Sequence, residues 1–406
     1  MIMKMMEKIL RGVRCVVATI VLLLVLLLLT TSISPIYRFA EPQPFGGPDI
    51  FDPYSTLDTA RVWRRATMHT PTRVEGLFNE CRYWPEEVVQ RYEPFGYDYV
   101  GISNHNEITP HPMGQGPDIY EHGYNLRNFH KLVIGAERVN YLDVPLPFHI
   151  SQLQWQLDML GRECDILQIN HPIRTPMLDM KTLSRLSGYD IMELTGAIDY
   201  IENDYWDWAL SAGHYSFGML SDDLHDPDTP IKIASRCILL ATPTTSEEDI
   251  LAALRSGCFY AMRVPNYGSG DWAIKRERNR SLPRICDIGL CCDTVYMELS
   301  AVADSIVVYG EDHTTLASAR NVEALSYRLK AEDSYARFVA YLPDCVVIMS
   351  NPFARYDASV ATMPGQRVTH HVDILLTLLY NLAIVGVAVL MVVLYIKYVI
   401  GWRREC

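Results

Sequence analysis

Imidazole, carboxylate and amide side chains recur at the ends of short apolar segments between residues 69 and 225. In chain order they are His69, Asn104, His105, Glu137, His149, His171, Asp223 and His225. Imidazoles and carboxylates without a nearby cysteine suit Zn, Mn or Fe ions. Two or three such ions can hydrolyse a phosphate ester, because they lower the pKa of a bound water and neutralise the phosphate oxygens. The residue types therefore predict divalent metal ions and phosphoester hydrolysis.

The segments that carry these side chains alternate between two apolar patterns. Short apolar runs typical of strands are separated by amphipathic stretches typical of helices, such as Pro85–Arg91 and Ser151–Arg162. The runs are Tyr97–Ile102, Lys131–Gly135, Ile166–Ile169, Ile191–Met192 and Phe217–Leu220. In a barrel of strand–helix units, residues at the carboxyl ends of the strands meet at one rim. We therefore expect an α/β fold that brings the eight side chains together.

The order and spacing of these residues resemble the PHP (polymerase and histidinol phosphatase) family between residues 61 and 262. The matching strings are Thr67–Thr70, Gly96–Asp98, Ser103–Asn106, Gly135–Glu137, Asn170–Arg174 and Ser221–His225, with His149 matched by its spacing. The resemblance implies a distorted (β/α)7 barrel, with Glu137 bridging the metals and with Asp223 and His171 in the catalytic site. Arg174 either holds a substrate phosphate through a bidentate contact or forms a salt bridge on the rim.

Two positions depart from the family pattern. Thr67 stands where the family has the first His of its opening motif, and Asn104 stands where it has an Asp. Threonine is a poor ligand for these metals, and asparagine offers a neutral carbonyl oxygen. The resemblance therefore implies two or three ions, of which two remain supported by the ligands present. The substitutions favour an alternative, in which an eroded barrel serves as a membrane binding or scaffold module.

Two apolar segments near the ends of the chain could cross a membrane. Cys15–Ile36 and Ile374–Ile396 contain no charged residue, and about 20 apolar residues suffice to span a bilayer as a helix. The first segment could instead be a cleaved signal peptide, and the second a buried core helix. Basic residues lie outside both segments. The positive-inside rule therefore predicts cytoplasmic termini and a main domain in a lumen, the periplasm or the exterior.

The charge distribution argues against nucleic acid as a partner. The chain carries a net charge of −12, and basic residues gather at its two ends. The stretch between the apolar segments is therefore more acidic than the whole chain. Such a surface repels a phosphate backbone.

The pattern changes after residue 284, where apolar runs and turns predict a small antiparallel β module. Four cysteines lie in this part, Cys286, Cys291, Cys292 and Cys345. Because an oxidising compartment permits pairing, we expect at least one disulfide among them.

These observations predict the following segments: cytoplasmic tail 1–14, transmembrane helix 15–36, linker 37–53, metal-binding barrel 54–283, β module 284–355, linker 356–372, transmembrane helix 373–397 and cytoplasmic tail 398–406. The expected function is membrane-anchored, metal-dependent hydrolysis of a phosphomonoester or phosphodiester. Membrane anchoring favours a lipid or glycolipid head group as substrate, although a small phosphorylated molecule also fits the metals. The alternatives are the scaffold module and a hydrolase that uses the same metals on a different bond.

Overall fold

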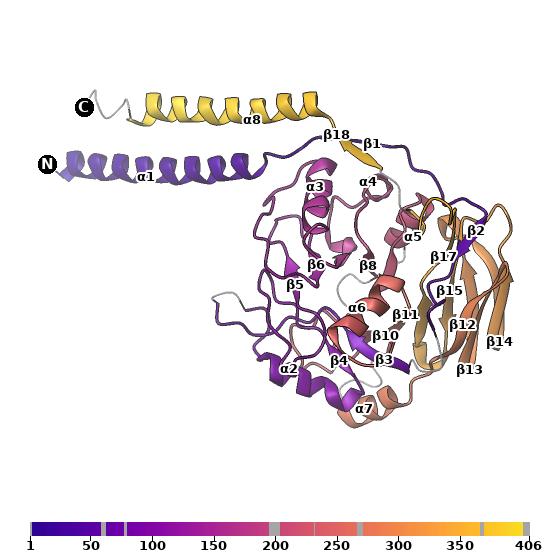
Figure 1. Cartoon of the computed structure of the whole chain (residues 1–406). Helices are drawn as coiled ribbons and strands as arrows, with labels where there is room; N and C mark the ends of the chain where they lie inside the picture. The colour runs from indigo at the N-terminus through magenta and orange to yellow at the C-terminus, as the bar shows by residue number, and fades with distance from the viewer. Residues whose placement is uncertain are drawn as a thin grey trace.

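The computed structural model describes residues 2–57, 62–76, 79–194, 204–230, 232–265, 271–365 and 369–400. Two long helices lie side by side and project from one side of an α/β body, and a β-rich module lies on the opposite side of that body (Figure 1). The last six residues of the predicted tail 398–406 fall outside the described residues.

The two projecting helices are α1, Ile2–Thr31, and α8, Ile374–Tyr395, which continues into a π-helical turn at Ile396–Ile400. Their apolar windows, Ile9–Thr31 and Ile374–Val399, are long enough to cross a membrane and are not buried within the protein. The first helix ends at Thr31, before the predicted boundary at residue 36. The chain leaves the helix there because the backbone of the next residues bonds to side chains of α8.

Several hydrogen bonds join the two ends of the chain. Asn381 in α8 accepts from the backbone N–H of Ser34 and donates to its carbonyl, both at 3.3 Å. The Thr377 hydroxyl accepts from the N–H of Ile36 at 2.9 Å. The short strand β1, Tyr37–Phe39, then pairs antiparallel with β18, His370–Val372. The helices therefore enter the body together, through one two-stranded sheet.

The body contains two groups of strands. One is a five-stranded sheet in the order β5 (Ile119–His122), β6 (Lys131–Ile134), β7 (Ile166–Ile169), β8 (Ile191–Glu193) and β9 (Phe217–Met219). Strand β6 runs antiparallel to both of its neighbours, whereas β7, β8 and β9 are parallel. The other group is β3 (Val62–Thr67), β4 (Tyr99–Val100), β10 (Arg236–Thr242) and β11 (Phe259–Arg263).

The strands are covered by helices α2 (Pro85–Tyr92), α3 (Ile150–Leu160), α4 (Met180–Leu183), α5 (Asp204–Ser211), α6 (Glu247–Ser256) and α7 (Trp272–Arg280). Leu157 of α3 and Leu254 of α6 belong to the main apolar core, together with Leu167 and Ile191 of the sheet. The predicted α/β character is present. The described strands of the body belong to two separate sheets, however, so the expected closed (β/α)7 barrel is not seen among them.

Antiparallel strands follow the body: β12 (Ile285–Cys291), β13 (Thr294–Tyr309), β14 (Thr315–Arg328), β15 (Tyr335–Tyr341), β16 (Val347–Ser350) and β17 (Phe353–Tyr356). They do not form an isolated sheet, because β16 pairs with β11 of the body and β17 pairs with β2, Asp49–Phe51. The module therefore continues the body's own sheet into one of eleven strands.

A buried ion pair also joins the module to the body. Arg337 of β15 donates from Nε and Nη2 to the two carboxylate oxygens of Asp207 in α5, at 2.9 and 2.6 Å. His313 contacts the same carboxylate. Burial alone would raise the pKa of Asp207, but Arg337 and His313 outweigh burial and lower it.

The predicted disulfide is absent from this structure. The four cysteines Cys286, Cys291, Cys292 and Cys345 are exposed free thiols. Cys291 and Cys292 lie at the Thr294 end of β13, whereas Tyr341, just before Cys345, pairs with Ser305. These two positions are roughly 35 Å apart along β13 at about 3.3 Å per residue. A disulfide between Cys345 and either Cys291 or Cys292 is therefore excluded by distance.

Candidate metal centre

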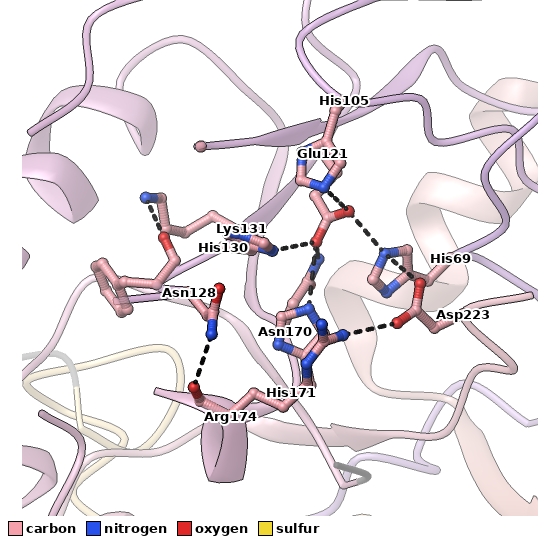
Figure 2. Close-up of polar contacts among 12 residues, drawn as sticks. His69, His105, Glu121, Asn128, His130, Lys131, Asn170, His171, Arg174 and Asp223 are labelled. Carbon is pink, nitrogen blue, oxygen red and sulfur yellow. Dashed lines mark hydrogen bonds and ion pairs between the residues drawn. The ribbon is translucent and has the colours of Figure 1, made fainter. Parts of the chain in front are cut away.

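Several of the polar side chains expected at the strand ends meet at one end of the five-stranded sheet (Figure 2). His69 follows β3, His105 follows β4, and His171 follows β7. Asp223 and His225 come after β9, and Glu193 ends β8. Two further residues join them from the antiparallel pair, Glu121 within β5 and His130 directly before β6.

Glu121 lies at the centre of the group and is only 2% exposed. Its carboxylate oxygens contact four imidazoles: His69 Nε2 at 3.1 Å, His105 Nε2 at 3.0 Å, His130 Nδ1 at 3.2 Å and His171 Nε2 at 3.4 Å. The Asn170 amide donates to the same carboxylate at 2.9 Å. One buried carboxylate surrounded by four imidazoles is a set of ligands for a borderline transition metal.

Asp223 provides a second carboxylate beside the first. Its Oδ1 lies 3.4 Å from His69 Nε2 and 3.2 Å from His225 Nε2, and its Oδ2 lies 3.3 Å from Arg174 Nη1. Asp223 has a φ of 46°, and its N–H donates to the carbonyl of His69 at 3.1 Å. A left-handed backbone costs energy in a residue with a side chain. The surrounding contacts therefore hold Asp223 in a conformation that it would otherwise avoid.

His69 is placed between the two carboxylates and is fully buried. Its Nε2 is near both carboxylates but has no hydrogen-bond partner of suitable geometry among the described residues. On its other side, Nδ1 is 3.3 Å from Glu193 Oε1, and Glu193 also accepts from the N–H of His171 at 2.7 Å. A carboxylate on the far nitrogen is the usual way in which a metal-binding imidazole is oriented.

The geometry fits a metal ion held by nitrogen and oxygen atoms. One ligand atom from each of His105, Glu121 and His130 lies within 4.8 Å of the others. Because zinc bonds to these atoms are about 2.0–2.2 Å long, atoms this close can share one ion. His69, His171, Asp223 and His225 offer ligands on the adjoining side. These residues could hold Zn, Mn or Fe, in agreement with the predicted divalent metals.

The charges in the group favour ionised carboxylates. Burial alone would raise the pKa of Glu121, but His69 and the hydrogen bonds from neighbouring imidazoles lower it far below its usual range. Burial alone would lower the pKa of His69, but Glu121, Asp223 and Glu193 outweigh it and raise that pKa. The pKa of His130 is lowered, with burial as the main cause. Ionised carboxylates are the forms that bind metals, and a metal ion would replace the proton that these carboxylates favour on His69.

The structure brings together six of the residues chosen from the sequence: His69, His105, His171, Arg174, Asp223 and His225. Arg174 contacts Asp223 at the rim, with 38% of its side chain exposed.

Glu137, the expected bridging carboxylate, does not join them. It is exposed in the loop after β6. Because β6 is antiparallel to β5 and β7, its carboxyl end faces the opposite end of the sheet, where the N–H of Gly135 bonds to the carbonyl of Asp118. The start of β6 lies at the cluster instead, and it delivers His130. Glu121 occupies the central position expected for Glu137.

His149 and Asn104 have other roles. His149 precedes α3, and its ring lies edge-on to Tyr380 of α8, with the centroids 5.1 Å apart. Asn104 is buried beside the cluster, where Oδ1 accepts from the N–H of Thr72 at 2.7 Å and Nδ2 donates to the hydroxyl of Thr109 at 2.8 Å. The amide that replaces the family's carboxylate therefore holds two loops together.

Sequence reasoning missed Glu121, His130 and Glu193. Glu193 ends an apolar run, so the rule that selected the other strand ends also marks it. Glu121 lies in the short strand Ile119–His122, of which only the first two residues are apolar, so the pattern of apolar runs did not mark this strand. His130 precedes an apolar run rather than following one, so only the direction of β6 could have identified it.

No family model matches this sequence, and no curated protein matches it. Among solved structures, a two-domain protein from Bacteroides vulgatus, described as containing a predicted PHP-like metal-dependent phosphoesterase, is similar to 78% of this chain and 98% of its own. The two sequences are 14% identical, and the TM-score is 0.37. Similarity this low does not show a function, which has to be inferred from the site.

Proposed function

We propose that this chain is a metal-dependent phosphoesterase whose substrate is confined to a membrane. The observation that carries the proposal is the convergence of four imidazoles on the buried carboxylate of Glu121. A purely structural body has no need of such a group, because burying carboxylates and imidazoles is costly unless they are paired or bind a metal. Bound metal ions would supply a water of lowered pKa and neutralise the charge of a phosphate.

The residues fall into two sets by exposure. His69, His105, His130 and His171 form the inner set around Glu121. Arg174 and His225 lie at the opening, with 38% and 41% of their side chains exposed. Arg174 can donate from its free N–H groups to a phosphate oxygen while Asp223 holds its position. The opening thus presents positive charge to an entering anion, and the inner set holds the metals.

The membrane part of the proposal rests on α1 and α8. Both are apolar along their length, both leave the body at the same place, and their ends are joined by Asn381 and Thr377. Such an anchor would keep the site near a lipid surface, so a phospholipid or glycolipid head group is the substrate class that we propose. With both termini cytoplasmic, the body would face a lumen, the periplasm or the exterior.

The test is a phosphoesterase panel on the purified full-length protein, with lipid and soluble phosphate esters. Asp223→Ala and His225→Ala should each abolish turnover and lower the metal content, while the control His149→Ala should retain the metal. A chelator should remove activity, and Zn or Mn should restore it. If the wild-type protein binds metal but hydrolyses none of the esters, the scaffold alternative replaces the enzyme.

A further inference from the structure

Two loops beside the metal centre expose large apolar side chains. Tyr124 and Leu126 follow β5, and Tyr141, Leu142 and Phe148 lie between β6 and α3. Each of the five is more than half exposed, from 54% for Tyr124 and Phe148 to 75% for Tyr141. Soluble proteins rarely gather so many exposed apolar side chains in one place. We call these five residues the apolar ridge.

One end of the ridge adjoins the helix pair. The N–H of Phe148 donates to Oε1 of Gln152 at 2.9 Å, and Nε2 of Gln152 donates to the carbonyl of Ser32 at 3.1 Å. Next to Phe148, the His149 ring packs against Tyr380. In Figure 1, α3 begins beside the place where the helices leave the body. The ridge is therefore continuous with the segments that would cross the membrane.

The other end of the ridge reaches the metal centre. The ring of Tyr124 stacks on that of His105, with the centroids 4.7 Å apart. The two loops are also bonded to each other, because the N–H of Leu126 donates to the carbonyl of Pro145 at 2.7 Å and the Leu142 carbonyl lies 2.9 Å from His122 Nε2. The two hydrogen-bonded loops thus connect the helix pair with the opening of the metal centre.

The position of Tyr380 along α8 places the two loops at the lipid surface. Tyr380 lies six residues into the 26-residue apolar window of α8, which is about 9 Å along a helix at 1.5 Å per residue. The whole window is about 39 Å long, longer than the hydrocarbon core of about 30 Å. Since the apolar window of α1 ends at Thr31 and the Tyr380 hydroxyl donates to the carbonyl of Ser32 at 3.2 Å, Tyr380 lies level with the end of α1, at the head-group layer. His149 and Phe148 lie at the same level, where tyrosine and other aromatic side chains are favoured.

We propose that the apolar ridge inserts into the head-group layer of the bilayer that α1 and α8 span, and that it sets the mouth of the metal centre against a lipid phosphate in the same leaflet. The second half of this inference rests on the proposed function; the first half does not. Arg174 supports the second half, because its backbone carbonyl accepts from the Asn128 side chain at 3.3 Å, so the segment that carries Arg174 lies against the loop that carries Tyr124 and Leu126.

Lipid contact is tested by fluorescence of the full-length protein in phosphatidylcholine vesicles with and without brominated acyl chains. Leu142→Trp should add emission that brominated lipid quenches. The control Val302→Trp, at an exposed apolar position of β13 in the far module, should add emission that it does not quench. Equal quenching of the two variants, or none for Leu142→Trp, would overturn the insertion. This readout does not depend on any enzyme activity.

The link to the substrate is tested by a second comparison. A Tyr141→Ser, Leu142→Ser and Phe148→Ser triple variant should lower the ratio of lipid to soluble ester turnover at least tenfold. An unchanged ratio would contradict the orientation of the site toward the bilayer. Absence of turnover on every ester, with Leu142→Trp still quenched, would overturn the proposed function and the link to a lipid substrate, while the insertion would stand.

Discussion

The Nε2 atom of His69 lies 3.1 Å from Oε2 of Glu121, and both side chains are buried. Nε2 has no hydrogen-bond partner of suitable geometry among the described residues, and a metal ion bound beside Glu121 would supply the missing partner. Three more imidazoles approach the same carboxylate.

Arg174 should act on the substrate and not on the metal. Arg174→Ala removes the guanidinium at the opening, and a hydrogen bond to a charged group is worth about 1.5–3 kcal/mol. We expect kcat/KM for a phosphate ester to fall at least tenfold, with metal content unchanged. Arg138→Ala, at an exposed arginine outside the cluster, is the control. Loss of metal in Arg174→Ala would instead assign the residue to the salt bridge with Asp223.

Glu193 should determine how well His69 binds metal. Its carboxylate holds Nδ1 of His69 and the N–H of His171, and removing a group of this kind typically weakens metal binding by about 10- to 100-fold. Glu193→Ala should therefore lower metal affinity in a competition assay with a chelator. Glu137→Ala should have no effect. Equal affinities of wild type and Glu193→Ala would show that His69 does not bind the metal.

A carboxylate at position 104, as in the PHP family that the sequence resembles, should not improve the site. Asn104→Asp replaces the N–H donor that bonds Thr72 and Thr109 by a buried carboxylate, at a cost of about 1–3 kcal/mol. We expect a lower midpoint of thermal unfolding and unchanged metal stoichiometry. An additional metal ion per chain in the variant would show that residue 104 points into the cluster.

The Asp207–Arg337 pair should make stability depend on pH. Because the folded-state pKa of Asp207 is lowered, the pair contributes stability above the usual pKa of an aspartate, about 3.9. That contribution is lost as the pH falls through the lowered value. Asp207→Asn leaves the Arg337 charge buried and unpaired, which should cost about 3–5 kcal/mol at pH 7.

Chemical unfolding at pH 7 and pH 3 measures both effects. The cost of Asp207→Asn should be smaller at the lower pH, because the wild-type pair is itself weakened there. Asp293→Asn, which breaks the exposed contact with Arg328, should cost less than about 1 kcal/mol at either pH. A cost for Asp207→Asn that is the same at both pH values would contradict the assignment.

The fold and the site were predictable to different extents. The apolar runs predicted the strands. The polar positions at the strand ends predicted that His69, His105, His171, Asp223 and His225 belong to the site. The direction of β6 could not be read from its composition, because Lys131–Ile134 has the same pattern whether the strand is parallel or antiparallel. Because β6 is antiparallel to its neighbours, its start and not its end lies at the cluster. His130 therefore lies at the cluster, whereas Glu137, which was predicted there, does not.

The central carboxylate was hidden for a different reason. Glu121 lies in a four-residue strand of which only Ile119 and Tyr120 are apolar, and its partners come from four separate segments of the chain. Periodicity reports on neighbours along one element, whereas the role of Glu121 depends on contacts between elements. The division of the body's strands into two sheets could not be predicted either, because it depends on which strands pair with one another.

The metal content of the full-length protein tests the central claim most directly. Glu121→Gln keeps the size of the side chain but removes the charge that the four imidazoles surround, and Glu137→Gln makes the same change at an exposed glutamate. We predict that the wild type and Glu137→Gln carry at least one Zn, Mn or Fe ion per chain after purification, and that Glu121→Gln carries substantially less while remaining folded. Equal metal content in Glu121→Gln and the wild type, or its loss in Glu137→Gln instead, would contradict the assignment of Glu121 as the centre of the site.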